Sequence, residues 1–322
     1  MNKTSIEWTH RPGTVGMTWN PIRARTGEVD HRTGSSLRTG TFCTRISPGC
    51  TNCYASAINK RFGTGAEYTV PNLANHEFYI DERILEEPLK RKKPATIFVG
   101  DMFDLFHEAI PFDFIKQVFH VAYCAPWHTF QMLTKRAQRM LTFFTWCYGK
   151  DLPSYASNPI GNIWLGVSVE SQKYADERIP WLLQTPAAVR FLSVEPLLEA
   201  VTLTNWLGNP ECPMLDWVIV GGESGPGARQ FAPYWAGKLL GQCRIVGTKF
   251  FMKQFGSNCY FRHFSAPHDN TKYSLDTPLL RDRAAIALEK EFNNWSRIKF
   301  KDRKGGDPSE WPEEVRVREF PA

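Results

Sequence analysis

Six short runs of β-branched and aromatic residues recur through the middle of this 322-residue sequence. Their starts are 26 residues apart at the shortest interval, from Ile163 to Val189, and 34 apart at the longest, from Thr129 to Ile163. An interval of this length holds one strand, a loop, a helix and a return turn. The runs lie at 96–99, 129–133, 163–167, 189–192, 217–220 and 249–252. They predict an α/β fold of repeated βα units with parallel strands.

The segments between the runs carry helical periodicity. Pro111 and Asp113 suit a helix N-terminus, and apolar residues then recur at helical spacing on one face. Further helices are expected at 137–148, 173–183 and 234–246, with Gly247 ending the last of them. The cysteines expected in the core of these helices are Cys124, Cys147 and Cys243. Structural roles are expected for His107 and His128, because neither has a metal-ligand neighbour in the sequence.

Polar residues follow every run. They are found at 100–101, 134–136, 168–170, 193–195, 221–224 and 253–254. In a parallel βα barrel the carboxyl ends of the strands meet at one rim, where the connecting loops build the active site. We therefore expect a partial (βα) TIM-type barrel, with a doubly wound open sheet as the alternative fold. For any single residue, the ordinary exposure of strand ends to solvent explains the polarity equally well.

The rest of the sequence suggests three parts. Residues 1–40 are rich in Gly, Thr and Arg, and are expected to form an N-terminal extension anchored by Trp8 and Trp19. Residues 41–255 would form the βα barrel with a three-cysteine metal loop, and 38–44 is a candidate for a seventh strand. Residues 256–322 lose the βα rhythm and are expected to form a C-terminal appendage packed on the barrel.

Composition narrows the class of protein. A hydrophobic fraction of 42% supports a substantial core, and the longest apolar runs are far shorter than the roughly 20 residues of a membrane span. No signal-peptide block follows Met1, so we expect a cytoplasmic protein without a membrane partner. The formal net charge of +6 fits a polyanionic partner without demanding one.

Three cysteines crowd one short segment, Cys43, Cys50 and Cys53, with the spacing C-x6-C-x2-C. Pro48 and Gly49 loosen the loop that carries them, so the three thiolates can close around one soft metal centre. Three ligands suit a [4Fe–4S] cluster, because one iron is then free to bind a substrate or cofactor. Three unrelated thiols are the simplest alternative reading.

Structural zinc is the alternative metal. Zinc would need a fourth ligand, and no further Cys or His lies close enough in sequence to complete a paired-knuckle pattern. The remote residues that could supply it are Cys259, His263 and His31. Zinc and an iron–sulfur cluster therefore both stay open at this point.

Residues 49–55 read Gly-Cys-Thr-Asn-Cys-Tyr-Ala and resemble the Gly-Cys-x-x-Cys-Tyr-Ala of the radical S-adenosylmethionine (SAM) superfamily, in the branch of spore photoproduct lyase. The sequence departs from that pattern in its longer first cysteine interval and in Asn52, where an aromatic residue is usual. The resemblance implies a partial βα barrel with a [4Fe–4S] cluster in the loop after its first strand. It also implies SAM as the cofactor.

A longer, ordered resemblance covers nearly the whole chain. Its blocks look like those of a phage and prophage family of three-cysteine-motif proteins without assigned biochemistry, from which the long segment between Pro21 and Cys43 departs. The blocks lie at 6–9, 19–21, 47–50, 104–107, 133–136, 165–170, 193–197 and 218–225. This resemblance implies a phage or mobile-element origin, a role in nucleic-acid modification or repair, and a phage-encoded protein as a further partner.

The resemblance to the radical SAM superfamily suggests ligand-binding roles for the polar residues at the rim. The expected contacts to SAM are Asp101, Ser168, Glu170, Gly221, Gly222 and Glu223, since glycines admit a ligand to the backbone and carboxylates can hold an ammonium or a ribose hydroxyl. The expected contacts to substrate are Lys135, Arg136 and Glu195. The structural alternatives are a tight turn at the glycines, a solvated helix start at 135–136, and salt bridges from Glu170 and Glu195 to Lys135 or Lys253.

DNA or RNA is the expected partner. The basic run 90–93, the arginines Arg23, Arg25 and Arg32 and the lysines of the C-terminal segment could form one face for a polyanion. Trp8 or Trp19 could stack on bases, or could equally be core anchors. The competing class is a non-catalytic phage protein that binds nucleic acid or a protein partner. In such a protein, zinc or an iron–sulfur cluster would only stabilise the fold.

Overall fold

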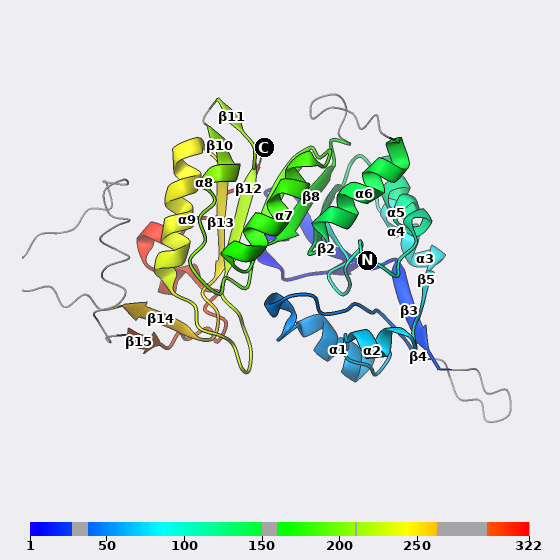
Figure 1. The fold of residues 1–322 in the computed structure, drawn as a ribbon, viewed down its shortest axis with the longest axis horizontal. Coiled ribbons are helices and arrows are strands. Elements are labelled where there is room, and N and C mark those ends of the chain that lie inside the picture. The colour runs from blue at the N-terminus through cyan, green and yellow to red at the C-terminus, as the bar shows by residue number, and fades with distance from the viewer. Residues whose placement is uncertain (28–37, 150–159, 210, 263–294, 322) are drawn as a thin grey trace, which may run out of the picture.

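Residues 1–27, 38–149, 160–209, 211–262 and 295–321 are described by the computed structural model. Their centre is an eight-stranded sheet in the order β1-β2-β6-β7-β8-β9-β12-β13, curled into a half-barrel (Figure 1). The short β1 is antiparallel to β2, and all later neighbours are parallel. The strands are β1 (Asn2–Lys3), β2 (Val15–Trp19), β6 (Ala95–Val99), β7 (Thr129–Thr134), β8 (Ile163–Ser168), β9 (Val189–Val194), β12 (Trp217–Gly221) and β13 (Lys249–Gln254).

All six predicted runs are strands of this sheet, and the predicted α/β class is confirmed. The parallel strands follow one another in sequence order. A doubly wound sheet instead reverses its strand order at a switch point. The alternative fold is therefore excluded.

The seventh parallel strand is β2, not the expected 38–44. β4 (Arg38–Gly40) pairs with β3 (Ile22–Thr26), which also pairs with β5 (Glu77–Ile80), in a separate antiparallel sheet. The strand signal of β2 is weak because Gly16 interrupts it. A Cβ at Gly16 would lie 2.1 Å from Oγ1 of Thr9, so only glycine lets this strand meet the 3-10 turn Glu7–Thr9.

Four long helices cover the outer face of the sheet (Figure 1). They are α5 (Phe112–Cys124), α6 (Ala137–Tyr148), α7 (Gln172–Gln184) and α9 (Pro233–Val246). The expected helices are thus confirmed, and Gly247 ends α9 in the left-handed conformation. Cys243 is buried as expected, but Cys124 and Cys147 are exposed, because they lie on the solvent sides of α5 and α6.

The remaining elements are short. They are α1 (Tyr54–Phe62), α2 (Val70–Leu73), α3 (Glu82–Leu85), α4 (Glu87–Lys90), α8 (Thr204–Leu207), β10 (Gly208–Asn209), β11 (Cys212–Pro213), β14 (Cys259–Arg262) and β15 (Trp295–Ile298), with 3-10 turns at Glu7–Thr9, Pro48–Cys50, Pro308–Glu310 and Glu313–Val315. None of the helices in the described ranges is long and apolar enough to cross a membrane.

Aromatic side chains fill the inner face of the half-barrel. Phe98, Trp164, Phe191, Trp217 and Phe251 form this inner aromatic cluster. It also contains Trp8 from the N-terminal segment and contacts Phe320 from the C-terminal one. Because Trp8 and Trp19 are both buried, the reading of either as a base-stacking surface is wrong, and the core-anchor reading is confirmed.

The described part of the C-terminal segment packs on the sheet. The Met252 amide of β13 donates to the Val317 carbonyl at 2.7 Å, and the Trp217 indole donates to the Glu319 carbonyl at 2.8 Å. Trp311 stacks on Phe255 with 5.2 Å between ring centroids. These contacts fasten the segment along the edge strand β13.

Candidate functional site

The cysteine loop lies across the carboxyl ends of the central strands. It is residues 41–53, between the small antiparallel sheet and α1, and is therefore reached from β2 through the β3–β4 hairpin. The polar residues that follow β6, β7, β8 and β12 all contact this loop or the first residue of α1. Three strand ends thus hold the loop, and a fourth, after β6, holds Tyr54 directly behind it.

Glu170, after β8, binds the middle of the loop. The backbone amide of Gly49 donates to its Oε1 at 3.3 Å, and Arg178 of α7 donates to its Oε2 at 2.9 Å. A Cβ at position 49 would lie 3.1 Å from this carboxyl group and 3.4 Å from Cε of Lys135, so glycine permits the close approach. The carboxylate is fully buried, and its salt-bridge partner is Arg178 rather than the expected Lys135 or Lys253.

Glu223, after β12, binds the last part of the loop. Arg229 donates to its two oxygens at 2.6 and 3.0 Å, and the Asn52 amide donates to it at 2.9 Å. Arg229 also reaches the Pro48 carbonyl at 2.8 Å. Burial raises the pKa of Glu223, but the hydrogen bonds from Arg229 and Asn52 outweigh it, so the net pKa is lowered and the carboxylate stays ionised.

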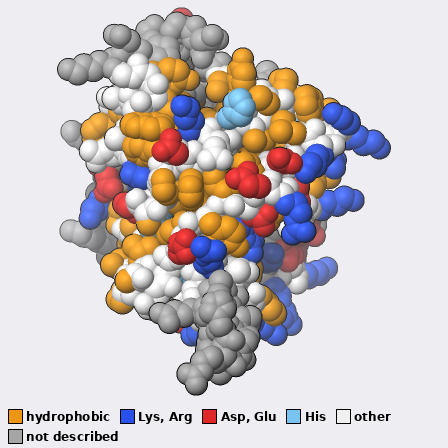
Figure 2. All heavy atoms as spheres, turned by 90° about the vertical axis from the view of Figure 1, so that its right-hand side faces the viewer, with side chains coloured by type: hydrophobic (Ala, Val, Ile, Leu, Met, Phe, Trp, Pro, Cys, Tyr) orange, Lys and Arg blue, Asp and Glu red, His pale blue; other side chains and the backbone are white. Residues whose placement is uncertain are grey.

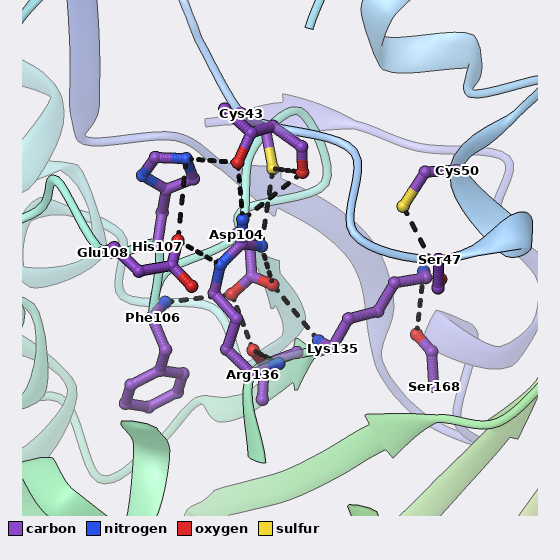
Figure 3. Close-up of polar contacts among 12 residues, drawn as sticks. Cys43, Ser47, Cys50, Asp104, Phe106, His107, Glu108, Lys135, Arg136 and Ser168 are labelled. Atoms are coloured by element: carbon purple, nitrogen blue, oxygen red, sulfur yellow. Dashed lines mark hydrogen bonds and ion pairs between the residues drawn. The ribbon is translucent and has the colours of Figure 1, made fainter. Parts of the chain in front are cut away.

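Arg136, after β7, binds the start of the loop (Figure 3). Its side chain is buried between two carboxylates, with Nη1 at 3.0 Å from Asp104 and Nε at 2.7 Å from Glu108. The remaining nitrogen, Nη2, donates to Oγ1 of Thr44 at 2.9 Å. Nη1 also lies 3.8 Å from Sγ of Cys43. The guanidinium is thus directed at the loop, although the sequence suggested a contact to substrate.

Behind this arginine, Asp104 and His107 complete the anchor. Burial raises the pKa of Asp104, but Arg136 and the hydroxyl of Thr134 lower it further, so the net pKa is depressed. His107 accepts from the Ala109 amide through Nδ1 at 3.1 Å and therefore donates from Nε2 to Oγ1 of Thr44 at 2.9 Å. His107 is fully buried, which fits the expected structural role.

Other predicted rim residues contact one another in pairs. Nζ of Lys135 lies 3.2 Å from the Ser168 hydroxyl. Glu195 accepts two hydrogen bonds from Nζ of Lys253, at 2.7 and 2.9 Å, which confirms the salt bridge that the sequence left open. The side chains of this pair are each 18% exposed, so they meet solvent more than Glu170 does.

Asp101 and the two glycines lie at the same rim. The Asp101 carboxylate accepts from the Asn20 amide at 2.7 Å, and its carbonyl accepts from the Tyr54 hydroxyl at 2.6 Å. Burial raises the pKa of Asp101. A Cβ at Gly221 would lie 3.2 Å from the carboxyl carbon of Glu195, and the Gly222 amide donates to the Gln254 carbonyl at 2.9 Å.

The three loop cysteines are free and partly exposed. Burial raises the pKa of the Cys43 thiol to about 12, against the opposing effect of Arg136. The Cys50 sulfur lies 3.8 Å from the Ser47 hydroxyl (Figure 3), and Cys43 and Cys53 border one small apolar cluster around Phe42 and Tyr68. Three free thiols on one anchored loop are a donor set suited to a soft metal.

Within the described ranges, no group of three or more His, Cys, Asp or Glu side chains is arranged to hold a metal ion. Of the fourth zinc ligands that the sequence suggested, Cys259 is buried in the main core. His31 and His263 lie outside the described residues. Neither metal is favoured by these positions, and the ligation stays a prediction.

Sequence reasoning missed several residues of the site, and three of them illustrate why. Asp104, Arg229 and Asn52 each contribute side-chain hydrogen bonds to the anchoring of the loop. Asp104 and Asn52 lie inside segments that the sequence singles out, but no spacing rule pairs them with the residues they contact. Arg229 lies six positions after Glu223, in a Gly-rich turn whose path could not be foreseen.

Most of the chain matches the model of one protein family. The model of a family described as "Protein of unknown function (DUF5131)" matches residues 31–307. The chain belongs to this family. The matched segment contains the cysteine loop and every rim residue discussed above, whereas β2 lies outside it. No curated protein and no solved structure matches the chain.

Proposed function

We propose that this protein is a radical SAM-like enzyme of phage or prophage origin, with a [4Fe–4S] cluster on Cys43, Cys50 and Cys53. The observation that carries the proposal is the anchoring of the three-cysteine loop across the carboxyl ends of successive parallel strands. The half-barrel with strands in sequence order is compatible with an incomplete TIM-type barrel. The resemblance of residues 49–55 to the superfamily supplies the reaction class.

The bound cluster and SAM would supply a one-electron cleavage that amino-acid side chains cannot perform. The chain's own residues hold and shield the site. Arg136, Glu170 and Glu223 fix the loop by its start, middle and end. The inner aromatic cluster fills the interior of the half-barrel with apolar side chains.

Solvent exposure distinguishes the residues that we propose to contact the substrate. Lys135 and the Glu195–Lys253 pair are partly exposed and are proposed to meet the substrate, whereas Arg136 is proposed to act on the loop. The residues proposed to surround SAM remain Asp101, Ser168, Glu170, Gly221, Gly222 and Glu223. Among these, Glu170 and Glu223 would act through the loop that they hold. Nucleic acid is the proposed substrate class, from the resemblance to the lyase branch and to phage proteins.

Anaerobic purification and reconstitution test this proposal. We expect about four irons and about four acid-labile sulfides per chain, and production of 5′-deoxyadenosine when reduced protein meets SAM. The Cys50→Ala variant should lose both, whereas Cys124→Ala, at an exposed cysteine outside the loop, should keep both.

Two other outcomes would replace the proposal. Stoichiometric zinc without sulfide, lost in Cys50→Ala, would identify a metal-stapled binding protein. A complete iron–sulfur cluster without any 5′-deoxyadenosine would reject SAM as the cofactor while keeping the ligands.

A further inference from the structure

A cavity of about 970 Å³ lies at the end of the sheet opposite the cysteine loop. It opens between α5 and α6, at the amino ends of β7 and β8. Its volume lies within the range of roughly 300–1,000 Å³ that is typical of ligand sites. Neither the rim nor the cysteine loop contributes to its lining.

The lining of this cavity is basic. Among the described residues that line it are Arg11 and Lys116, and none of those residues is Asp or Glu. The Arg11 guanidinium lies 4.5 Å from the ring centroid of Trp164 and donates to Oγ1 of Thr129 at 2.8 Å. Within the described residues neither cation forms an ion pair with a carboxylate. Burial lowers the pKa of Arg11, so a bound anion would compensate a cation that is partly removed from water.

Exposed aromatic rings border the same cavity. Tyr123 is 63% exposed, Tyr148 is 48% exposed and Trp127 is 36% exposed. The Trp127 indole is held by a hydrogen bond of 2.7 Å to the Arg91 carbonyl, with Nζ of Lys92 at 5.6 Å from its ring. The basic run singled out in the sequence therefore adjoins Trp127. Figure 2 looks onto the side of the molecule that carries α3 to α6, and shows hydrophobic side chains across this face, with Asp and Glu among them and many Lys and Arg side chains toward one edge.

We propose that this aromatic and basic cavity binds single-stranded nucleic acid, with a base against the exposed rings and phosphates near Lys116 and near Arg11. Aromatic faces accept any base, and cations without competing carboxylates favour the phosphate. A concave site of this size admits an unstacked nucleotide but not a duplex. This inference rests on the cavity alone and does not depend on a metal at the cysteine loop.

Fluorescence anisotropy of a fluorescein-labelled single-stranded DNA of about 12 nucleotides tests the proposal. We expect tighter binding than for the duplex of the same sequence, and a steep loss of affinity between about 50 and about 200 mM salt. Tyr123→Ala and Lys116→Glu should each weaken binding about tenfold, and Lys116→Arg should restore most of it. Both residues are exposed, so thermal melting should show that these variants fold.

Lys173→Glu is the matched control, because Lys173 is an exposed lysine beside a tyrosine on α7, outside the cavity. Unchanged binding in this control would support the cavity, and binding by wild-type protein prepared without iron or SAM would separate it from the proposed radical chemistry. Equal losses in Lys173→Glu and Lys116→Glu would overturn the proposal. Absence of binding at about 50 mM salt, or binding of AMP without binding of the oligonucleotide, would also overturn it.

Discussion

Arg136 lies with Nη1 3.8 Å from the sulfur of Cys43 while the same nitrogen is 3.0 Å from Asp104. One buried cation thus joins the end of β7 to the first cysteine of the loop. Because Asp104 also accepts from the Lys135 amide and the Thr134 hydroxyl, the carboxylate that orients the arginine is itself fixed. The position of Cys43 therefore depends on residues that are far from it in sequence.

Replacing Arg136 with Met should lower the free energy of unfolding by about 3 kcal/mol, because Asp104 would be left as an uncompensated buried charge. Arg136→Lys should cost less, since it keeps the charge but loses the planar fork. Urea denaturation measures both effects. Arg83→Met, at an exposed arginine on α3, should change stability by less than about 0.5 kcal/mol.

The same variants should free the start of the loop. In Arg136→Lys, which keeps a cation beside the Cys43 thiol but loses the planar fork, the rate of Cys43 alkylation by iodoacetamide, followed by peptide mass spectrometry, should rise relative to that of Cys124. If stability fell but the Cys43 rate stayed at the wild-type value, Arg136 would support the fold without positioning this cysteine.

Glu170 and Arg178 should behave as a coupled pair. Glu170→Gln leaves the buried Arg178 without its carboxylate, and should destabilise the protein by roughly 3 kcal/mol. Adding Arg178→Met should cost much less than a second independent loss, because the uncompensated charge disappears. A double-mutant cycle from urea denaturation measures the coupling. Strict additivity of the two losses would show that the pair does not act as a unit.

Folding stability should fall in mild acid because of His107. Burial and the nearby Arg136 lower its pKa from 6.5 to about 4, so the unfolded chain binds the proton more readily than the folded one. The stability that the neutral ring contributes is complete above pH 6.5 and is lost as the pH falls toward 4. His107→Gln should flatten the stability profile in this window. His10→Gln, at an exposed histidine, should leave the slope unchanged.

Gly49→Ala should disturb the loop at its closest approach to the rim. The new Cβ would lie 3.1 Å from the Glu170 carboxyl group, which Arg178 holds in place. We expect a loss of about 1 kcal/mol in stability and, if the proposed cluster forms, a lower iron content after reconstitution. Gly161→Ala, where a Cβ meets nothing within 4 Å, serves as the control. A wild-type iron content and melting temperature in Gly49→Ala would show that the contact is loose.

The repeated strand signals made most of the sheet predictable from sequence. Buried parallel strands read as continuous apolar runs, and their spacing reports the helices between them. β2 was not predicted as a strand because Gly16 and Thr18 break its apolar run. Its buried Met17 and Trp19 therefore resemble isolated anchors. The exposed positions of Cys124 and Cys147 were not predicted, because the residue type alone does not show which face of a helix a cysteine occupies.

The sequence predicted which site residues lie near one another, but not which groups they contact. The rule that strand ends converge brought Arg136, Glu170 and Glu223 to one rim. It could not assign their partners, because these depend on the path of the loop and of the turn before Arg229. The cavity between α5 and α6 has no sequence motif, since its lining comes from four separate stretches of chain.

The meeting of Trp8 and Phe320 on Trp217 has a consequence for biosynthesis. Ring centroids lie 6.3 Å apart for the first pair and 5.5 Å apart for the second. A nascent chain that has emerged from the ribosome only as far as β13 can pair its parallel strands in order, but it leaves the side of Trp217 that Phe320 contacts uncovered. The packing of the barrel interior therefore waits until residue 320 has emerged, and a chain stalled before that residue would present an aromatic surface to chaperones.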